Sequence, residues 1–429
     1  MSLLVAGGRL VDPSQGLDGA FDLRLVDGLV AELAPRLPAR PGEDVLDAAG
    51  LVVAPGFIDM HVHLREPGQE AKETVATGVA AAVAGGFTAV ACMANTLPAN
   101  DSRLVTGLIR AAAARVGLAH VHPIGAISRG LEGQELAPFG ELVAAGCVAV
   151  SDDGRPVQSA ELMRRALEHA QHFGLLVIQH AQDLELTGDG VMHEGEWSTR
   201  SGLPAIPGAA EDVMVARDLV LLEDYGGRYH VAHVSTARSL AMVRDAKRRG
   251  LPVSCEVTPH HLVLADRQVV ESGFETRFKM NPPLRAEADV AALLAGIADG
   301  TVDAIASDHA PHHADEKCQP FEVAPLGVIG LETTVSICLD RLVRAGKIPL
   351  SRLIDLLSCG PARVLGVAGG SLAPGCPGDV TLLDLERRVR LESAGFRSRS
   401  RNSPFDGWSA VGAAAATVVA GRVVFRASA

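Results

Sequence analysis

Two histidines separated by one residue, His61 and His63, end an apolar run that starts at Val52. Side chains alternate along a strand, so these two imidazoles reach the same side, as two ligands of one metal ion must. A lone His-x-His pair is common in proteins, but further candidates stand at the ends of other apolar runs. They are one aspartate of the pair Asp152 and Asp153, and His180, His233 and Asp308. The pattern indicates a metal site built from several strand ends.

The chemistry of these six groups favours a pair of metal ions. Burying them together without a partner would cost several kcal/mol for each group, whereas divalent cations offset their charge. Imidazole and carboxylate ligands favour zinc or a related first-row ion. Six ligands are too many for one catalytic zinc ion with an open position, and they suit two ions about 3.5–4 Å apart that share a bridging hydroxide. We therefore predict a hydrolase with two Zn²⁺ per chain.

The elements that carry these residues repeat one pattern from about residue 52 to 345: an apolar run, a polar turn and an amphipathic stretch that often ends at glycine. The expected strands are residues 52–63, 88–92, 119–127, 147–151, 175–180, 229–234, 252–257 and 304–308. Continuous apolar strands are typical of a parallel sheet buried on both faces. Eight such units predict an α/β fold, a (β/α)8 TIM-type barrel, with catalytic residues at the carboxyl ends of its strands. A doubly wound sheet is the alternative, but no GxGxxG motif follows the first run.

The two ends of the chain follow a different pattern. Residues 1–51 and 371–429 contain short strand-like runs separated by Gly, Pro and Asp. Neither end is long enough to form a good core alone. We expect them to pack together as one small composite β-sandwich beside a barrel domain of residues 52–370.

Composition excludes several classes of function. The chain has 429 residues, 48% of them apolar, and a net charge of −12, which disfavours nucleic acid and anionic membranes as partners. It contains no apolar run long enough to span a membrane and no basic, apolar leader, so we expect a cytoplasmic protein. Its seven dispersed cysteines, without a CxxC pair, favour reduced thiols. An anionic substrate would need local positive charge at its site.

Longer motifs surround the candidate ligands. Residues 56–68 read GFIDMHVHLREPG, and further motifs are MANT at 93–96, SDDG at 151–154, EVTPHH at 256–261, KMNPPLR at 279–285 and SDHAPH at 307–312. By these motifs the chain resembles the amidohydrolase superfamily and, within it, the bacterial class I dihydroorotase family, over nearly its whole length. The resemblance implies that His61, His63 and Asp308 hold the first metal ion and His180 and His233 the second. It also implies that Asp153, rather than Asp152, bridges the two ions.

The resemblance further implies the reaction and the residues that bind the substrate. The family catalyses the reversible cyclisation of N-carbamoyl-L-aspartate to (S)-dihydroorotate plus water, a step of de novo pyrimidine (UMP) biosynthesis. In the hydrolytic direction the bridging hydroxide would attack the ring carbonyl, and Asp308 would carry its proton to the leaving nitrogen. Arg65 would bind the free carboxylate of the substrate through two hydrogen bonds. The other contacts implied for the substrate are His63, Asn95, Asn281, His312 and the backbone of Leu326 and Gly327.

Four positions depart from the usual family pattern: Cys92, Ala94, Gln182 and Leu326. None of them removes a metal ligand, so we expect them to change the rate more than the type of reaction. The polar residues 312–325 form a long loop that we expect to act as a lid.

The sequence leaves two rival interpretations of its function, and two associations are compatible with it. Hydantoinases, dihydropyrimidinases and allantoinases usually bridge their metal ions with a carboxylated lysine at the end of the fourth strand, and residues 147–154 contain no lysine. Some dihydroorotase-like chains are catalytically silent subunits assembled with aspartate transcarbamoylase, but those have typically lost metal ligands. Association with aspartate transcarbamoylase is also compatible with an active enzyme. A homodimer is expected because two-fold assemblies are the commonest among soluble proteins.

Overall fold

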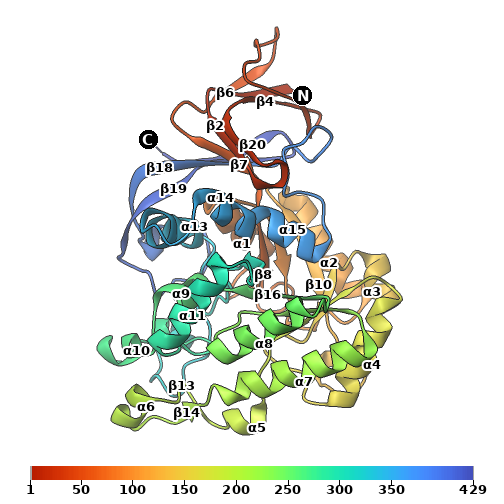
Figure 1. The fold of residues 1–429 in the computed structure, drawn as a ribbon, viewed down its shortest axis with the longest axis vertical. Helices are drawn as coiled ribbons and strands as arrows, with labels where there is room; N and C mark the ends of the chain where they lie inside the picture. The colour runs from red at the N-terminus through yellow and green to blue at the C-terminus, as the bar shows by residue number, and fades with distance from the viewer. Residues whose placement is uncertain (1, 429) are drawn as a thin grey trace.

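The computed structural model describes residues 2–428, and its centre is a ring of eight parallel strands. The strands follow each other around the ring in chain order, as Figure 1 shows in part. They are β8 (Phe57–Val62), β9 (Phe87–Cys92), β10 (His120–Gly125), β11 (Ala149–Ser151), β12 (Leu176–Gln179), β15 (Arg228–Val231), β16 (Val253–Val257) and β17 (Ala304–Ile305). The ring closes just beyond β17, where Val62 pairs in parallel with His309 and the His63 amide donates to the His309 carbonyl over 2.8 Å. The predicted (β/α)8 barrel is confirmed.

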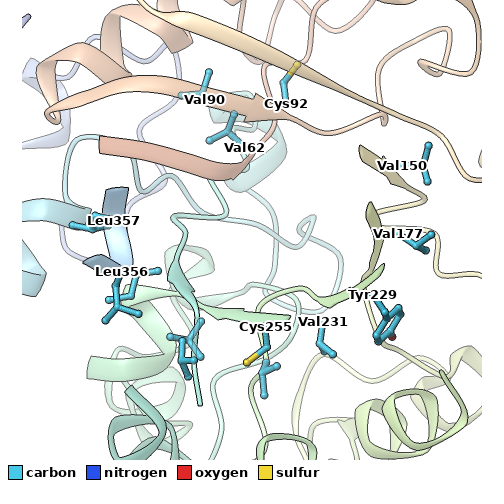
Figure 2. Close-up of a cluster of buried hydrophobic side chains, with 14 of the residues drawn as sticks. Val62, Val90, Cys92, Val150, Val177, Tyr229, Val231, Cys255, Leu356 and Leu357 are labelled. Carbon is cyan, nitrogen blue, oxygen red and sulfur yellow. The ribbon is translucent and has the colours of Figure 1, made fainter. Parts of the chain in front are cut away.

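Apolar side chains on the outside of the ring pack against the surrounding helices. In Figure 2, Val62, Val90, Val150, Val177, Tyr229 and Val231 point away from the middle of the ring. The principal helices are α1 (Val75–Ala84), α2 (Arg103–Val116), α3 (Phe139–Ala145), α4 (Ala160–Gln171), α7 (Ala209–Tyr225), α8 (Ala237–Arg248) and α11 (Glu287–Ala298). A chain of shorter helical segments then follows: α13 (Thr334–Cys338), η4 (Leu339–Arg344), α14 (Leu350–Ile354), η5 (Asp355–Cys359) and α15 (Gly360–Leu365). Side-chain caps such as Thr74 on α1 and Thr236 on α8 fix where helices begin.

The two ends of the described chain form two sheets that share one apolar core. One sheet contains β1 (Ser2–Ala6), β4 (Asp22–Val26), β5 (Leu29–Ala34) and β6 (Asp44–Asp47). The other contains β2 (Arg9–Asp12), β3 (Leu17–Ala20), β7 (Val52–Pro55), β18 (Val380–Arg390), β19 (Ser409–Val419) and β20 (Arg422–Arg426). Leu25 from the first sheet and Val53 and Leu382 from the second lie in the same buried cluster. The expected β-structure made from both ends is therefore present beside the barrel, at the top of Figure 1.

The expected single strand over residues 52–63 is wrong, because the run is divided at Gly56. Residues before the break, Val52–Pro55, pair with β18 and β2 in the terminal sheet, and only Phe57–Val62 joins the barrel. A Cβ atom at residue 56 would lie 2.3 Å from Thr88 Oγ1 and 2.8 Å from the Asp379 Cβ. Glycine therefore lets the chain pass closely between the two sheets, a contact that no local pattern reveals.

Several short elements lie at the loops and were not predicted. They are β13 (Met192–His193), β14 (Ala205–Ile206), α5 (Leu184–Thr187), α6 (Glu196–Ser201), α9 (Pro259–Val263), α10 (Arg267–Glu271) and α12 (Ala314–Lys317). Single turns complete the set: η1 (Pro13–Gln15), η2 (Arg129–Leu131), η3 (Thr276–Phe278) and η6 (Ser393–Gly395). Within residues 2–428, the helices are all too short or too polar to cross a bilayer.

Candidate metal centre and substrate cavity

The six predicted metal ligands meet at the carboxyl ends of the barrel strands, with Asp153 among them. One Asp153 oxygen, Oδ1, lies 3.4 Å from His61 Nε2, 3.5 Å from His180 Nδ1 and 3.6 Å from His233 Nε2. Its other oxygen lies 3.4 Å from His63 Nε2, which in turn is 3.1 Å from Asp308 Oδ1. Two sets of ligand atoms lie close enough to hold an ion, namely His61, His63 and Asp308, and His61, Asp153 and His233.

The chemistry of this cluster fits metal ions. His61 Nε2 and Asp153 Oδ1 are buried and have no hydrogen-bond partner within the described chain. Burial alone would lower the pKa of His61, yet the carboxylates of Asp153, Glu256 and Asp308 raise this pKa well above its usual value. The cluster therefore attracts positive charge, and neutral imidazoles with two carboxylates are a donor set that zinc accepts.

Local backbone conformations direct these side chains inward. Val62 packs in the outer layer between His61 and His63, which both face the centre. After Val231, which also packs outward, a φ of 30° at His233 interrupts the alternation of the strand and turns this imidazole inward. Asp308 has a φ of 46° and Arg65 a φ of 62°. Such left-handed conformations are strained for residues other than glycine, and they are typical of functional sites.

The neighbouring residues Asp152 and Asp153 have different partners in the structure. Asp152 is fully buried and accepts hydrogen bonds from the amides of Ile127 and Ser128, at 2.7 and 3.0 Å, and from the Ser128 hydroxyl. It thereby fixes the loop that follows β10. Only Asp153 touches the histidine cluster.

A second layer of polar groups orients the imidazoles. His61 Nδ1 donates to Glu256 Oε1 at 2.6 Å, and His63 Nδ1 donates to Asn95 Oδ1 at 2.8 Å. On the other side, Gln182 Oε1 accepts from His180 Nε2 at 2.9 Å and from Asn281 Nδ2 at 2.7 Å. These bonds leave the opposite ring nitrogens for the metal centre. The role of Glu256 could not be predicted from its motif at residues 256–261, although this residue stands near the end of β16 on the inward side.

Next to the cluster lies a cavity of about 210 Å³. Its walls include five of the six predicted metal ligands, all except His61, and every predicted substrate residue: His63, Arg65, Asn95, Asn281, His312, Leu326 and Gly327. Arg65 Nε donates to the Pro311 carbonyl at 3.2 Å, which holds the guanidinium at the cavity wall. His312 Nε2 donates to the Leu326 carbonyl at 2.8 Å, so this backbone oxygen already has a partner. The roles of these residues toward a substrate stay predictions.

The charge around His312 fixes its protonation. Burial, together with the nearby cations of Arg65, Lys317 and Lys72, lowers the pKa of His312 to about 3. The imidazole is therefore neutral at neutral pH and carries its proton on Nε2. Its Nδ1 has no hydrogen-bond partner within the described residues and can accept one from a ligand in the cavity.

The fold matches that of solved hydantoinases over nearly the whole chain. Two solved structures with the same fold are an L-hydantoinase (dihydropyrimidinase) from Arthrobacter aurescens, with a TM-score of 0.88 and 23% identity, and a D-hydantoinase (dihydropyrimidinase) from a Thermus species, with a TM-score of 0.84 and 26% identity. The matches cover 99% of this chain and 96% and 95% of those chains.

Sequence comparison gives a narrower result. The family model described as dihydro-orotase-like matches residues 50–239. Curated proteins named dihydroorotase are 56% identical in Anaeromyxobacter dehalogenans, over 98% of this chain and 97% of the relative, and 53% identical in Citrifermentans bemidjiense, over 100% of both. The chain belongs to the dihydroorotase family.

Proposed function

We propose that this chain is a zinc-dependent dihydroorotase that interconverts N-carbamoyl-L-aspartate and (S)-dihydroorotate in pyrimidine biosynthesis. The observation that carries the proposal is the shared cavity, in which Arg65 stands in one wall and the histidine and aspartate ligands in another. Curated relatives at 50–56% identity bear the dihydroorotase name. Asp153 at the fourth strand, in place of a lysine, argues against the hydantoinase alternative.

The residues divide between two proposed zinc ions. His61, His63 and Asp308 would hold the first ion, His180 and His233 the second, and Asp153 lies close enough to four of the imidazoles to serve both. When bound, the ions would polarise the substrate carbonyl and acidify the attacking water. The protein holds the ligand nitrogens toward the centre through Glu256, Asn95 and Gln182.

Substrate binding follows from the charge and hydrogen-bonding groups of the cavity. With Arg65 Nε bound to Pro311, the terminal nitrogens are left to form two parallel hydrogen bonds with the substrate carboxylate. His312 Nδ1, which has no hydrogen-bond partner within the described residues and lies 3.5 Å from Glu316 Oε2, would accept a hydrogen bond from a ring N–H. Asn281, which is tied to Gln182, would contribute a side-chain amide. These groups would fix the ring so that its amide carbonyl faces the metal ligands.

Asp308 is the proposed proton carrier. In hydrolysis the water oxygen bonds to the ring carbonyl carbon and gives its proton to the Asp308 carboxylate; the C–N bond then breaks as Asp308 protonates the departing nitrogen. In cyclisation Asp308 removes a proton from the carbamoyl nitrogen as that nitrogen attacks the carboxylate carbon. The C–O bond then breaks as one carboxylate oxygen takes this proton and leaves as hydroxide, which a solvent proton converts to water. Burial would raise the pKa of Asp308, but His61 and His63 beside it hold this pKa far below its usual range, so the carboxylate is ionised before the reaction.

We further propose that the enzyme is cytoplasmic, that it acts as a homodimer, and that it can associate with aspartate transcarbamoylase. The last is an analogy with other dihydroorotases. Co-purification of a complex from a mixture of both enzymes at micromolar concentration would support it, and separate elution on size exclusion would argue against it.

One experiment tests the function: metal analysis of the purified protein, joined to an ultraviolet assay of dihydroorotate and N-carbamoyl-L-aspartate interconversion. Near two zinc ions per chain with turnover is the expected result. Turnover on hydantoins instead of dihydroorotate would assign the chain to the hydantoinase alternative. Absence of metal and of activity after zinc is added would favour a silent subunit.

A further inference from the structure

One buried lysine close to the cavity has no direct role in the proposed reaction. Lys317 is the last residue of α12 and is only 9% exposed. Its ammonium group donates to the carbonyls of Pro325 at 2.8 Å, Gly327 at 2.9 Å and Lys279 at 3.3 Å. No carboxylate of the described chain forms an ion pair with it. Burying a charged lysine among carbonyl oxygens, without a carboxylate, costs folding free energy. This cost suggests that the lysine has a specific role at this position.

The partners of Lys317 belong to two walls of the substrate cavity. Leu326 and Gly327 line it directly, and Lys279 precedes Asn281, which also lines it, by two residues. The Gly327 amide donates to the same Lys279 carbonyl at 3.0 Å, so the two segments are joined at one oxygen. Lys317 binds both sides of this junction.

All three carbonyls of residues 325–327 accept a hydrogen bond from a side chain. Lys317 binds those of Pro325 and Gly327, His312 binds that of Leu326, and Asn402 Nδ2 adds a second bond to Gly327 at 2.9 Å. Every carbonyl is therefore turned toward a donor, and within the described chain the Leu326 amide has no acceptor. Gly327 adopts a φ of 132°, where a Cβ atom would lie 2.9 Å from His312 Nε2, so the segment is also held close to this imidazole.

We propose that Lys317 is a positioning residue for substrate affinity: its ammonium joins residues 279–281 and 325–327 into one rigid wall that presents the Leu326 amide and the Asn281 side chain to the substrate ring. This inference rests on the proposed function. Because Lys317 touches neither a metal ligand nor the reacting atoms, its removal changes binding of the ring and leaves the chemical step intact.

The test uses the full-length, zinc-loaded enzyme and the variants Lys317→Met and Lys317→Gln. The first keeps the length of the side chain without donors, and the second keeps a polar group in case the first does not fold. Lys347→Met, at an exposed lysine, is the control for loss of one positive charge. We expect Lys317→Met to raise KM for both substrates about tenfold, as loss of about one net hydrogen bond would, with kcat within about twofold and zinc content unchanged.

A second readout follows the backbone itself. Hydrogen exchange of the Gly327 amide, which donates to the Lys279 carbonyl, should become at least about tenfold faster in Lys317→Met, while exchange in α4 and α8 stays as in the wild type. Unchanged KM and unchanged exchange in a folded variant would overturn the proposal. So would a fall in activity that only follows loss of zinc.

The failures of the two proposals are distinguishable. If wild-type enzyme does not turn over dihydroorotate, the proposed function fails, whereas the exchange measurement still decides whether Lys317 orders the wall. If the wild type is active and Lys317→Met has wild-type KM, only the positioning role fails.

Discussion

Glu256 gives the sharpest test of how the protein orients its proposed metal ligands. The Glu256 carboxylate is 1% exposed and accepts the Nδ1 proton of His61 at 2.6 Å, while its second oxygen faces His230 Nε2 at 3.4 Å. The substitution Glu256→Gln keeps the shape and leaves an amide oxygen for His61, but it removes the charge. A hydrogen bond to a charged group contributes about 1.5–3 kcal/mol and a neutral one about 0.5–1.5 kcal/mol. The expected loss is about 1–2 kcal/mol of zinc binding, or a roughly 5- to 30-fold weaker zinc affinity.

The assay is a zinc titration of metal-free protein against a competing chelator, with circular dichroism to verify the fold. Glu332→Gln is a matched control, because the Glu332 carboxylate accepts hydrogen bonds from the backbone amides of Arg397 and Ser398, away from the proposed metal centre. It should bind zinc as the wild type does. A folded Glu256→Gln protein with wild-type zinc affinity would refute the reasoning that a charged acceptor makes His61 a better ligand.

Three further perturbations test other parts of the site and fold. Asp308→Ala should lower kcat by about 10³-fold or more in the dihydroorotate assay while the melting temperature shows a folded barrel, and wild-type turnover would contradict the proton-carrier role. Arg65→Lys should raise KM by about tenfold, because a single ammonium cannot form two parallel bonds with a carboxylate; steady-state kinetics with an unchanged KM would argue against this contact. In the terminal sheets, the Arg24 guanidinium beside Glu43 lowers the pKa of that carboxyl from 4.5 to about 2, against the effect of burial. The ion pair therefore stabilises the fold above pH 4.5, and this stabilisation is lost as pH falls toward 2. Thermal unfolding of Glu43→Gln should therefore differ from the wild type at pH 5 and approach it near pH 2, and a constant difference across this range would contradict the assignment.

The barrel and most of its site could be predicted from sequence because both depend on local patterns. A buried parallel strand is a short apolar run, and a ligand at its carboxyl end lies within three residues of the end of the strand. His180 after β12 and Asp308 after β17 follow this rule. The break of the first run at Gly56 could not be predicted, because it depends on Thr88 and Asp379, which are distant in sequence.

Other features lay beyond local patterns for related reasons. Alternation predicts an outward side chain at residue 233, and only the positive φ of His233 turns it inward. Asp152 and Asp153 are chemically alike, and their roles differ only through the amides of Ile127 and Ser128 that reach Asp152. Lys317 stands in a polar loop sequence typical of exposed residues, and its burial depends on carbonyls from two other segments.

The terminal sheets have a consequence for the order in which the chain can fold. Strand β7 lies between β2, about forty residues earlier, and β18, more than 300 residues later. During synthesis the barrel strands emerge while one edge of β7 still has no partner, and an unpaired apolar edge invites association with other chains. The equilibrium cost of closing so long a loop is modest because it grows only with the logarithm of length. Pairing of β7 with a strand so distant in sequence is nevertheless slow. A circularly permuted chain that begins near residue 371 would supply β18 before β7 and should therefore refold with less aggregation than the natural order.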